Sequence, residues 1–566
     1  MAQKLLLLTL VALCLHQALA FSFSFPFNFP RSAVAAKPKV VFPDLYEATI
    51  AELQDGLERR HFTSVDLVKA YFARIDEVNL KGPELRAVLE VNPSALKQAA
   101  ALDKERKLGI RRGPLHGIPV LLKDNIATRF EDGMNTTAGS FSLLKSVVPG
   151  DATVAAKLRK AGAIFLGKAN LSEWAHFRGA LPSGWSGRGG QCTNAYFPSA
   201  DPCGSSSGSG VAASIGLVAV TLGSETDGSI TCPSSYNNIA GIKPTVGLTS
   251  RHGVIPISEH QDTVGPMTRT VTDAAIVLSV MAGRDPADNF TLAQPRIVPD
   301  FTKSLNKKAF RGARIGVPRI VFTDDNFTGN DPSINVAFTK ALATIKSLGA
   351  TVVDPADLPS ALEIAQSNNE TIVLDVDFKI NLRQYMEALK KVPTGVRSLA
   401  DLIAFNDAHP ELEEPPQFED QSQLIEAQAT TVNQTFFDAL AADHVLGSTQ
   451  GIDFVLKKFK LDALVLPANG FTTVPAAIVG YPIGRVTVPL GFHPDNTTVV
   501  PGSAGPLTVF PAPGVPFGLS FLGTAFSESK LIGFAYAFEQ ATHVRLQRKA
   551  FAAAIPKTQL ADIVGK

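Results

Sequence analysis

Apolar residues recur along most of the chain in two patterns. Helical spacing predicts helices over 47–58, 64–78, 93–106, 154–161, 272–281 and 528–541. Short apolar runs bounded by turn residues predict buried strands over 87–90, 118–122, 163–167, 313–317, 461–467 and 517–523. Thr63, with Asp66 three residues later, is typical of a helix start. The alternation of helices with buried strands predicts the α/β class.

The densest run of glycine and serine interrupts this alternation at 203–210, and a second serine motif ends at Ser229. Between them, the first half of Val211–Leu222 is small and favours a helix. The second half is β-branched and apolar and predicts a buried strand. Two serine-bearing loops therefore bracket one helix–strand unit, and loops carried by rigid elements are frequent sites of chemistry.

Residues of about 300–440 are more polar and contain most of the acidic runs, such as Glu411–Glu414. We interpret this stretch as a variable, helical and solvated excursion from the main domain. No internal repeat is evident.

Length and charge narrow the class of protein. The chain has 566 residues, of which 45% are hydrophobic and 19% are charged, so it can bury a large core. Its 53 basic and 52 acidic residues leave a net charge of +1. Nothing in this balance indicates a nucleic acid or an anionic membrane as a partner.

The N-terminus has the features of a secretory signal. Lys4 precedes an apolar core over Leu5–Leu15, and Ala18-Leu19-Ala20 is a small-x-small cleavage site. The apolar core is too short for a transmembrane helix. We therefore expect residues 1–20 to be removed, residues 21–40 to be an unstructured lead-in, and the mature protein to be secreted without a membrane anchor.

The positions of asparagine, cysteine and histidine bear on glycosylation, disulfide formation and metal binding. Candidate glycosylation sites are Asn135, Asn170, Asn289, Asn326, Asn369, Asn433 and Asn496. We exclude Asn170, because it follows an expected strand. Cys14 leaves with the signal, and the remaining three cysteines allow either a Cys192–Cys203 bridge or three buried thiols, with Cys232 unpaired in both cases. No spacing resembles a zinc site, and we expect neither a metal nor a cofactor.

Three chemistries compete for the serine-rich run. Residues 204–208 match G-x-S-x-G, which would make Ser206 the nucleophile of an α/β-hydrolase esterase. A glycine- and serine-rich run meets that pattern easily, and His409, His444, His493 and His543 lie in no recognisable context for a partner. A phosphate-binding loop would need a lysine that is absent after the glycines. The third possibility is a relay of Lys123, Ser205 and Ser229, in which burial lowers the lysine pKa and makes it a base.

Several linked motifs resemble the amidase signature family over about 45–285 and again over 461–541. They are the lysine motif Gly117–Asp124, the segment Gly167–Trp174, the run Gly204–Ser209, the motif Thr226–Ser229, and the segments Gly241–Thr245 and Asp262–Pro266. From its composition, we interpret Asp262–Pro266 as a turn-rich loop. The version Glu225-Thr226-Asp227-Gly228-Ser229, with the loop 184–191 upstream, is most similar to the peptide-amidase-like branch.

The resemblance implies one large α/β domain over 41–566, with a central mixed, twisted β-sheet covered by helices on both faces. It also implies roles. Ser229 is the nucleophile, Ser205 the bridging serine on a cis peptide bond, and Lys123 the base. The backbone N–H groups of Thr226, Asp227, Gly228 and Ser229 hold the oxyanion. Many family members carry glycine where Asp227 stands, which puts the local loop geometry in question. From the upstream loop we expect Trp185, Gly189 and Gln191 to contact substrate.

The resulting hypothesis is a secreted serine hydrolase that converts an amide and water to a carboxylate and ammonia or an amine, acting on C-terminal peptide amides. Because the relay needs a neutral Lys123, we expect activity to rise into the alkaline range. The alternatives are the esterase that uses Ser206 and an inactive binding protein on an amidase scaffold. A component of a tRNA-dependent amidotransferase fits the same fold, but the signal peptide argues against it.

Overall fold

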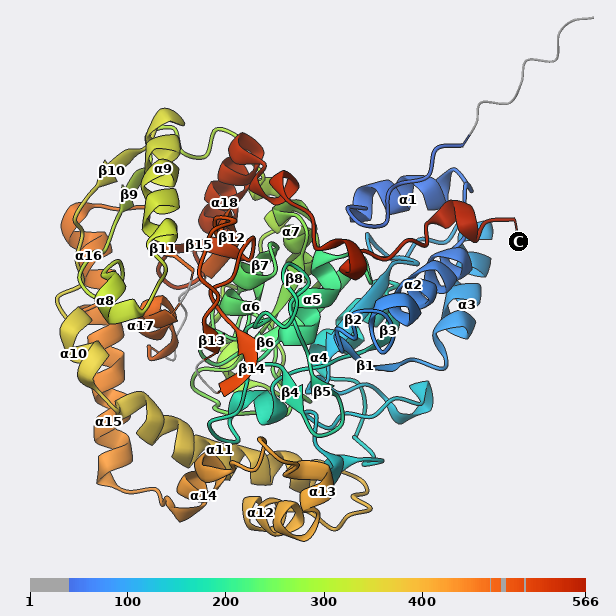
Figure 1. The fold of residues 1–566 in the computed structure, drawn as a ribbon, viewed down its shortest axis with the longest axis horizontal. Coiled ribbons are helices and arrows are strands. Elements are labelled where there is room, and N and C mark those ends of the chain that lie inside the picture. Colours follow the sequence, from blue (N-terminus) through green and yellow to red (C-terminus); the bar gives the residue numbers. More distant parts are fainter. Residues whose placement is uncertain (1–39, 469, 480–484, 503–504, 566) are drawn as a thin grey trace, which may run out of the picture. The chain divides into compact units, whose positions relative to one another are not determined.

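A mixed β-sheet forms the centre of the protein (Figure 1), and eleven strands belong to it within the residues that the structure describes. The computed structural model describes residues 40–468, 470–479, 485–502 and 505–565. The predicted signal, Cys14 and nearly all of the lead-in lie outside this range. Residues Phe42–Lys566 form one compact unit.

The strand order explains how distant motifs meet. In spatial order the strands are β1 (Val88–Val91), β3 (Ile164–Ala169), β2 (Pro119–Lys123), β6 (Val220–Glu225), β8 (Thr263–Thr268), β7 (Ala240–Lys243), β12 (Arg485–Phe492), β15 (Pro516–Leu522), β11 (Ala463–Pro467), β9 (Arg314–Gly316) and β10 (Thr351–Val353). Strand β2 is parallel to both β3 and β6, whereas β6, β8, β7, β12, β15 and β11 are successively antiparallel. Parallel neighbours end at the same edge of a sheet, so the ends of β2 and β6 lie side by side.

Helices flank the sheet on both faces, as the resemblance implies. On β7, a Cβ at Gly241 would meet the side chain of Ser234 on α6 (Thr231–Tyr236). The next residue, Ile242, belongs to the apolar cluster of α7 (Val271–Met281) and α18 (Glu528–Thr542). Successive strand residues point to opposite faces. Helix α6 therefore covers one face and α7 and α18 cover the other.

The predicted helix start at Thr63 is confirmed, and the preceding helix starts in the same way. Helix α2 (Ser64–Val78) begins after Thr63, whose side chain accepts from the Asp66 N–H while the Asp66 carboxylate accepts from the Thr63 N–H. Helix α1 (Ile50–Glu58) has the same arrangement with Thr49 and Glu52. Helices α3 (Ala95–Lys107) and α4 (Thr153–Lys160) lie where helical spacing predicts them.

Residues 262–266 differ from the sequence interpretation, which made them a turn-rich loop. They lie almost wholly within β8, between β6 and β7. A Cβ at Gly265 would come within 1.9 Å of the Ile242 carbonyl oxygen. The glycine therefore permits a close approach of two strands rather than a turn.

The polar stretch of about 300–440 is not wholly an excursion, because it contributes β9, β10 and the core helix α9 (Ser333–Ser347). Its later part is helical, with α11 (Asn369–Ala388), α12 (Leu399–Ala408), α13 (Pro410–Glu413), α14 (Ser422–Ala429) and α15 (Gln434–His444). Figure 1 shows these helices gathered at one end of the unit, below the sheet in this view. No helix among the described residues is both long and apolar enough to cross a membrane.

Candidate active site

Lys123 is the last residue of β2, and every residue of that strand is buried. Its Nζ lies 2.7 Å from the Ser205 Oγ and donates to the Ser224 carbonyl oxygen (3.1 Å) and the Ser224 Oγ (3.0 Å). Ser224 is on the adjacent β6, so the parallel pairing of the two strands creates these contacts. The structure thus brings the predicted base and the predicted bridging serine into direct contact.

Burial determines the protonation of Lys123. Desolvation lowers its pKa from 10.5 to about 7, while the charges of Asp262 and Glu225 raise it and oppose the effect. An ammonium with so little water around it loses its proton near neutrality. At pH 8 most molecules therefore hold a neutral amine that can accept a proton from Ser205.

Ser205 follows a cis peptide bond with Gly204, as the resemblance implies. It lies just before α5 (Ser207–Ser214), which packs closely on its surroundings because its residues are small. A Cβ at Gly208 would lie 2.1 Å from the Ala87 carbonyl oxygen, and the Gly208 N–H donates to the Asn170 carbonyl. The glycine- and serine-rich run is therefore the tightly packed start of a buried helix.

Ser229 ends the turn that follows β6, and the Ser206 N–H donates to its carbonyl oxygen at 3.2 Å. The turn is closed by Glu225, whose carboxylate accepts from the N–H groups of Ile230 (2.7 Å) and Thr231 (2.8 Å). Gly228 has φ +74°, a conformation that favours glycine. The two predicted serines are thus carried by adjoining backbone segments.

The backbone of this turn leaves the Ser229 N–H directed away from α6. The Gly228 carbonyl accepts from the Cys232 N–H at 2.7 Å, inside the helix. In a trans peptide the C=O and N–H point in opposite directions, so the N–H of the same peptide, that of Ser229, points the other way. This orientation suits a donor to an oxyanion. Thr226 is fixed at the start of the turn because its hydroxyl donates to Asp262 Oδ1 at 2.6 Å.

The cysteine pairing differs from both sequence alternatives. Cys203 is bonded to Cys232, and Cys192 is a buried free thiol. Spacing could not reveal this pair, because the two cysteines are brought together only when β6 returns the chain beside the Ser205 loop. Asn170 is buried, and its Nδ2 donates to the carbonyls of Arg86 and Gly190; its exclusion as a glycosylation site stays a prediction.

The three expected substrate contacts lie in or beside the hairpin of β4 (Trp185–Ser186) and β5 (Gly190–Gln191). Trp185 is 3% exposed and stacks on Phe418, with the Arg178 guanidinium over its ring. Gly189 packs against the Asn170 side chain, and Gln191 Nε2 donates to the carbonyls of Ser183 and Cys192. These contacts are with protein, and substrate binding by the three residues stays a prediction.

Sequence reasoning missed the residues that surround the base. Ser224 provides two acceptors to Lys123, and Asn125 Nδ2 donates to the same Ser224 hydroxyl at 2.9 Å. The available signal was position: Asn125 is two residues beyond the lysine, and Ser224 is two residues beyond the predicted strand that ends at Leu222. The alternative nucleophile, Ser206, is fully buried, and its hydroxyl donates to the Ser224 carbonyl at 3.1 Å.

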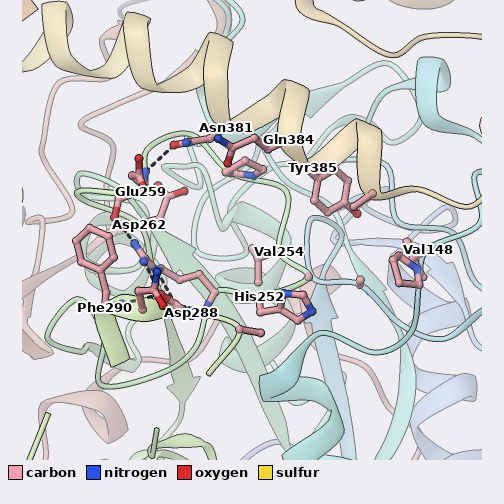
Figure 2. A pocket seen from close by; sticks show the side chains of 18 of the residues that line it. Val148, His252, Val254, Glu259, Asp262, Asp288, Phe290, Asn381, Gln384 and Tyr385 are labelled. Atoms are coloured by element: carbon pink, nitrogen blue, oxygen red, sulfur yellow. Dashed lines mark hydrogen bonds and ion pairs between the residues drawn. The ribbon is translucent and has the colours of Figure 1, made fainter. Parts of the chain in front are cut away.

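A pocket of about 440 Å³ adjoins this site on the Asp262 side (Figure 2). Its walls come from the loop that contains Glu259 and Asp262 and from the α11 residues Asn381 and Tyr385. A void of about 10 Å³ shares Asp262 with this pocket and reaches Asn125, Ser224 and Thr226. The pocket therefore lies close to the partners of Lys123.

Comparison with known proteins agrees with this geometry. The family model described as Amidase matches residues 66–532. A protein of Arthroderma benhamiae that is classed by name with the amidases is 44% identical, over 90% of this chain and 88% of its own. A glutamyl-tRNA(Gln) amidotransferase chain of Geobacter metallireducens is 32% identical, over 89% of this chain and 99% of its own. Among solved structures, the peptide amidase of Stenotrophomonas maltophilia superimposes with a TM-score of 0.79 at 41% identity, covering 92% of this chain and 100% of that one.

Proposed function

The chain belongs to the amidase family and is an amide-bond hydrolase, and on that premise we propose that it is a secreted enzyme that hydrolyses C-terminal peptide amides through Lys123, Ser205 and Ser229. The observation that carries the relay is the 2.7 Å contact between Lys123 Nζ and Ser205 Oγ, made by a lysine whose pKa burial lowers to about 7. Family membership removes the esterase alternative that uses Ser206.

The relay moves one proton in each step. Neutral Lys123 takes the proton of Ser205, Ser205 takes that of Ser229, and the Ser229 oxygen attacks the amide carbonyl. The oxyanion that forms is held by the N–H groups of the Thr226–Ser229 turn. Ser205 then gives its proton to the departing nitrogen and regains one from Lys123, so that ammonia leaves, an acyl ester remains on Ser229 and Lys123 is neutral again. Water cleaves the ester through the same relay and releases the carboxylate.

The substrate proposal rests on likeness to peptide amidase, which extends over nearly the whole length of both chains. A screen of amidated peptides, fatty amides and aryl amides, read by the release of ammonia or amine, tests it. We expect amidated peptides to be cleaved best. Preference for fatty or aryl amides would contradict the substrate class while leaving the amidase assignment intact.

Variants test the relay on the best substrate. Ser229→Ala and Lys123→Ala should each lower kcat by at least about 10³-fold, because one removes the nucleophile and the other the base. Ser206→Ala is the matched control on the neighbouring residue. It removes one neutral hydrogen bond and should cost less than about tenfold. A Ser229→Ala variant that keeps its kcat would reject the relay, and a wild type that a fluorophosphonate fails to label would favour the inactive scaffold.

Secretion is supported by independent features of the mature chain. A disulfide between Cys203 and Cys232 is typical of proteins that fold in an oxidising compartment. Four of the predicted sequons have exposed asparagines: Asn289, Asn326, Asn433 and Asn496. At Asn433 the Oδ1 accepts from the Phe436 N–H, which leaves the Nδ2 for a sugar.

The other sequons are poor acceptors in the folded protein. Asn135 Nδ2 donates to the Glu90 carboxylate at 2.9 Å, Asn170 is buried, and the half-buried Asn369 hydrogen-bonds Asp443. We expect protein secreted from a eukaryotic host to carry glycans at the four exposed sites only. Peptide mass spectrometry after enzymatic deglycosylation in heavy-oxygen water checks this. A modified Asn170, or secretion with no glycan at any site, would contradict it.

A further inference from the structure

The Cys203–Cys232 disulfide joins the two loops that carry the serines of the proposed relay. Cys203 is two residues before Ser205, and Cys232 is three residues after Ser229. We propose that this disulfide positions Ser205 and Ser229 for proton transfer, so that the bridge sets the rate of catalysis as well as the stability of the fold. The inference rests on the proposed relay, and it concerns two residues that are not themselves members of that relay.

The relay residues are not equally fixed by secondary structure. Lys123 is part of a buried strand between two parallel neighbours, so its Cα position is set by the sheet. Ser205 precedes α5, and Ser229 follows the turn after β6, so neither lies in a helix or strand. Their relative position therefore depends on contacts between the two loops.

Hydrogen bonds also join those loops. The Ser206 N–H donates to the Ser229 carbonyl, and Asn237 Nδ2 donates to the carbonyls of both Pro202 (2.8 Å) and Pro233 (2.8 Å). All three of these are hydrogen bonds. Within the described residues the disulfide is the one covalent bond between side chains.

The conformation of Cys203 also depends on its partners. Its φ is +53°, which is unfavourable for a residue with a Cβ. Such a conformation persists where the surroundings over-determine it. Here its N–H donates to Asp201 Oδ1 (2.7 Å), its carbonyl accepts from the Ser207 hydroxyl (2.6 Å), and its sulfur is held by Cys232. Loss of the bridge removes the contact that links this residue to the Ser229 side.

Proton transfer between the two serines is sensitive to a change in their relative position. A displacement of about 1 Å of a reacting group can cost roughly 10²-fold in rate. We expect substrate binding to depend on other surfaces, so loss of the bridge should change KM less than kcat. The expected signature is a fall in kcat of roughly 10- to 100-fold with KM changed less than about twofold.

The test compares the double variant Cys203→Ala/Cys232→Ala, which lacks the bridge, with the control Cys192→Ala, which lacks the buried free thiol and keeps the bridge. Wild type is also reduced with dithiothreitol under native conditions: the S–S bond takes two electrons and two protons, and the reagent becomes its cyclic disulfide. Both sulfur-bearing residues are half-buried, so the reagent has access. The readouts are the rate of fluorophosphonate labelling at Ser229, kcat and KM on the best amide, and the Tm, with all rates measured well below the lowest Tm.

Slower labelling and lower kcat in the double variant and in reduced wild type, both restored in wild type by reoxidation, support the proposal. Cys192→Ala should behave as wild type. A lower Tm with unchanged labelling and kcat would show that the bridge is structural only and would overturn the inference. If the double variant does not fold, reduced wild type that retains its circular dichroism spectrum decides the question. Failure of wild type to be labelled at all would instead reject the proposed relay.

Discussion

At the scale of single residues, the proposed relay makes the pH dependence of activity depend on the buried lysine. Burial lowers the pKa of Lys123 to about 7, and its neutral form is the proposed base. We therefore expect kcat/KM to rise about tenfold per pH unit below pH 7 and to level off above it, since this quantity reports the ionisation of the free enzyme. A pH–rate profile on a neutral amide checks this, and a maximum near pH 4 would contradict it.

The variant Asp262→Asn provides a second test of whether Lys123 determines the pH–rate profile. The Asp262 charge raises the lysine pKa, so its removal should move the acid limb of the profile to lower pH. The amide oxygen can still accept from the Thr226 hydroxyl, whereas the NH2 replaces the oxygen that accepts from the Ile257 N–H, so the variant loses that hydrogen bond. A limb that moves to higher pH would show that a group other than Lys123 titrates.

The residues of the proposed relay could be singled out from the sequence, whereas the residues around them could not. Lys123 and the two serines belong to linear motifs with fixed neighbours. Ser224 and Asn125 become partners of the lysine only through the pairing of β2 with β6. The Cys203–Cys232 bond likewise depends on where the chain returns, which cysteine spacing does not encode.

At the scale of elements, Glu225 holds the turn that presents Ser229. Its buried carboxylate accepts from the Ile230 and Thr231 N–H groups at the start of α6. Glu225→Gln replaces charge-assisted hydrogen bonds with neutral ones: the amide oxygen can take the place of Oε2, which accepts from both N–H groups, while the NH2 faces the Thr231 hydroxyl at the position of Oε1. We expect the free energy of unfolding to fall by about 2 kcal/mol and kcat to fall by at least about tenfold. Urea unfolding and steady-state kinetics measure the two effects.

A matched control is Glu52→Gln on α1, where the carboxylate accepts from the exposed Thr49 N–H at 2.9 Å. It changes the same kind of cap on an element distant in sequence from the relay. Its kcat should equal that of wild type. If Glu225→Gln also kept full activity, the turn would not depend on this carboxylate.

Strands were predictable where they are continuous apolar runs, as in β2, β3, β11 and β15. Strand β8 was not, because Gly265-Pro266 has the composition of a turn. In the fold this glycine permits contact with β7, and the proline lies opposite Leu222 of β6. The sequence shows that a glycine can adopt a turn or allow a close backbone contact. Which of the two occurs depends on the neighbouring strand.

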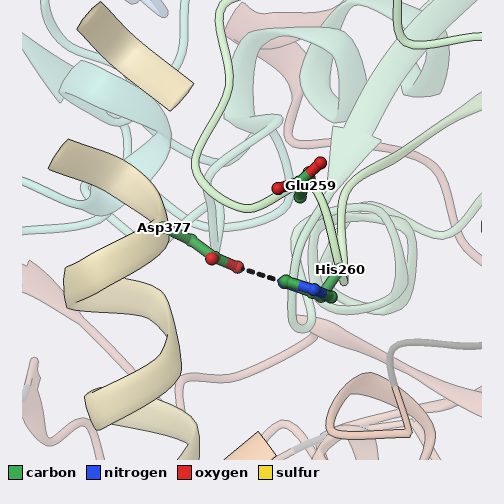
Figure 3. A group of neighbouring side chains, drawn as sticks. All are labelled: Glu259, His260 and Asp377. Carbon is green, nitrogen blue, oxygen red and sulfur yellow. Dashed lines mark hydrogen bonds and ion pairs between the residues drawn. The ribbon is translucent and has the colours of Figure 1, made fainter. Parts of the chain in front are cut away.

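At the scale of the whole molecule, the helical excursion is attached to the loop whose Asp262 holds the start of the Thr226–Ser229 turn. Asp377 on α11 accepts from the Ser258 hydroxyl (2.5 Å) and lies 2.7 Å from His260 Nδ1, and Asn381 accepts from the Glu259 N–H (2.8 Å). Figure 3 shows α11 meeting the loop at this group. The contacts join residues more than 100 positions apart, so the polar composition of the excursion predicted its exposure but not its attachment.

The His260–Asp377 pair makes this attachment dependent on pH. Burial alone would lower the His260 pKa, but the hydrogen bond and charge of Asp377, together with Glu259, outweigh burial and the opposing charge of Arg251 and raise it. A folded pKa above the unfolded value of about 6.5 means that the stabilisation is complete below pH 6.5. It is lost as the pH rises through the folded pKa.

His260→Gln should therefore lower the Tm more at pH 6 than at pH 8.5. The exposed His409, 3.9 Å from Glu411, provides the control, and His409→Gln should lower the Tm little at either pH. Thermal unfolding of both variants and wild type across pH 5.5–8.5 measures the difference. A His260→Gln deficit that is constant or grows with pH would exclude the ion pair as its source. If the deficit follows the expected course, the attachment of the excursion weakens as the pH rises above about 6.5, which is also the direction in which Lys123 loses its proton.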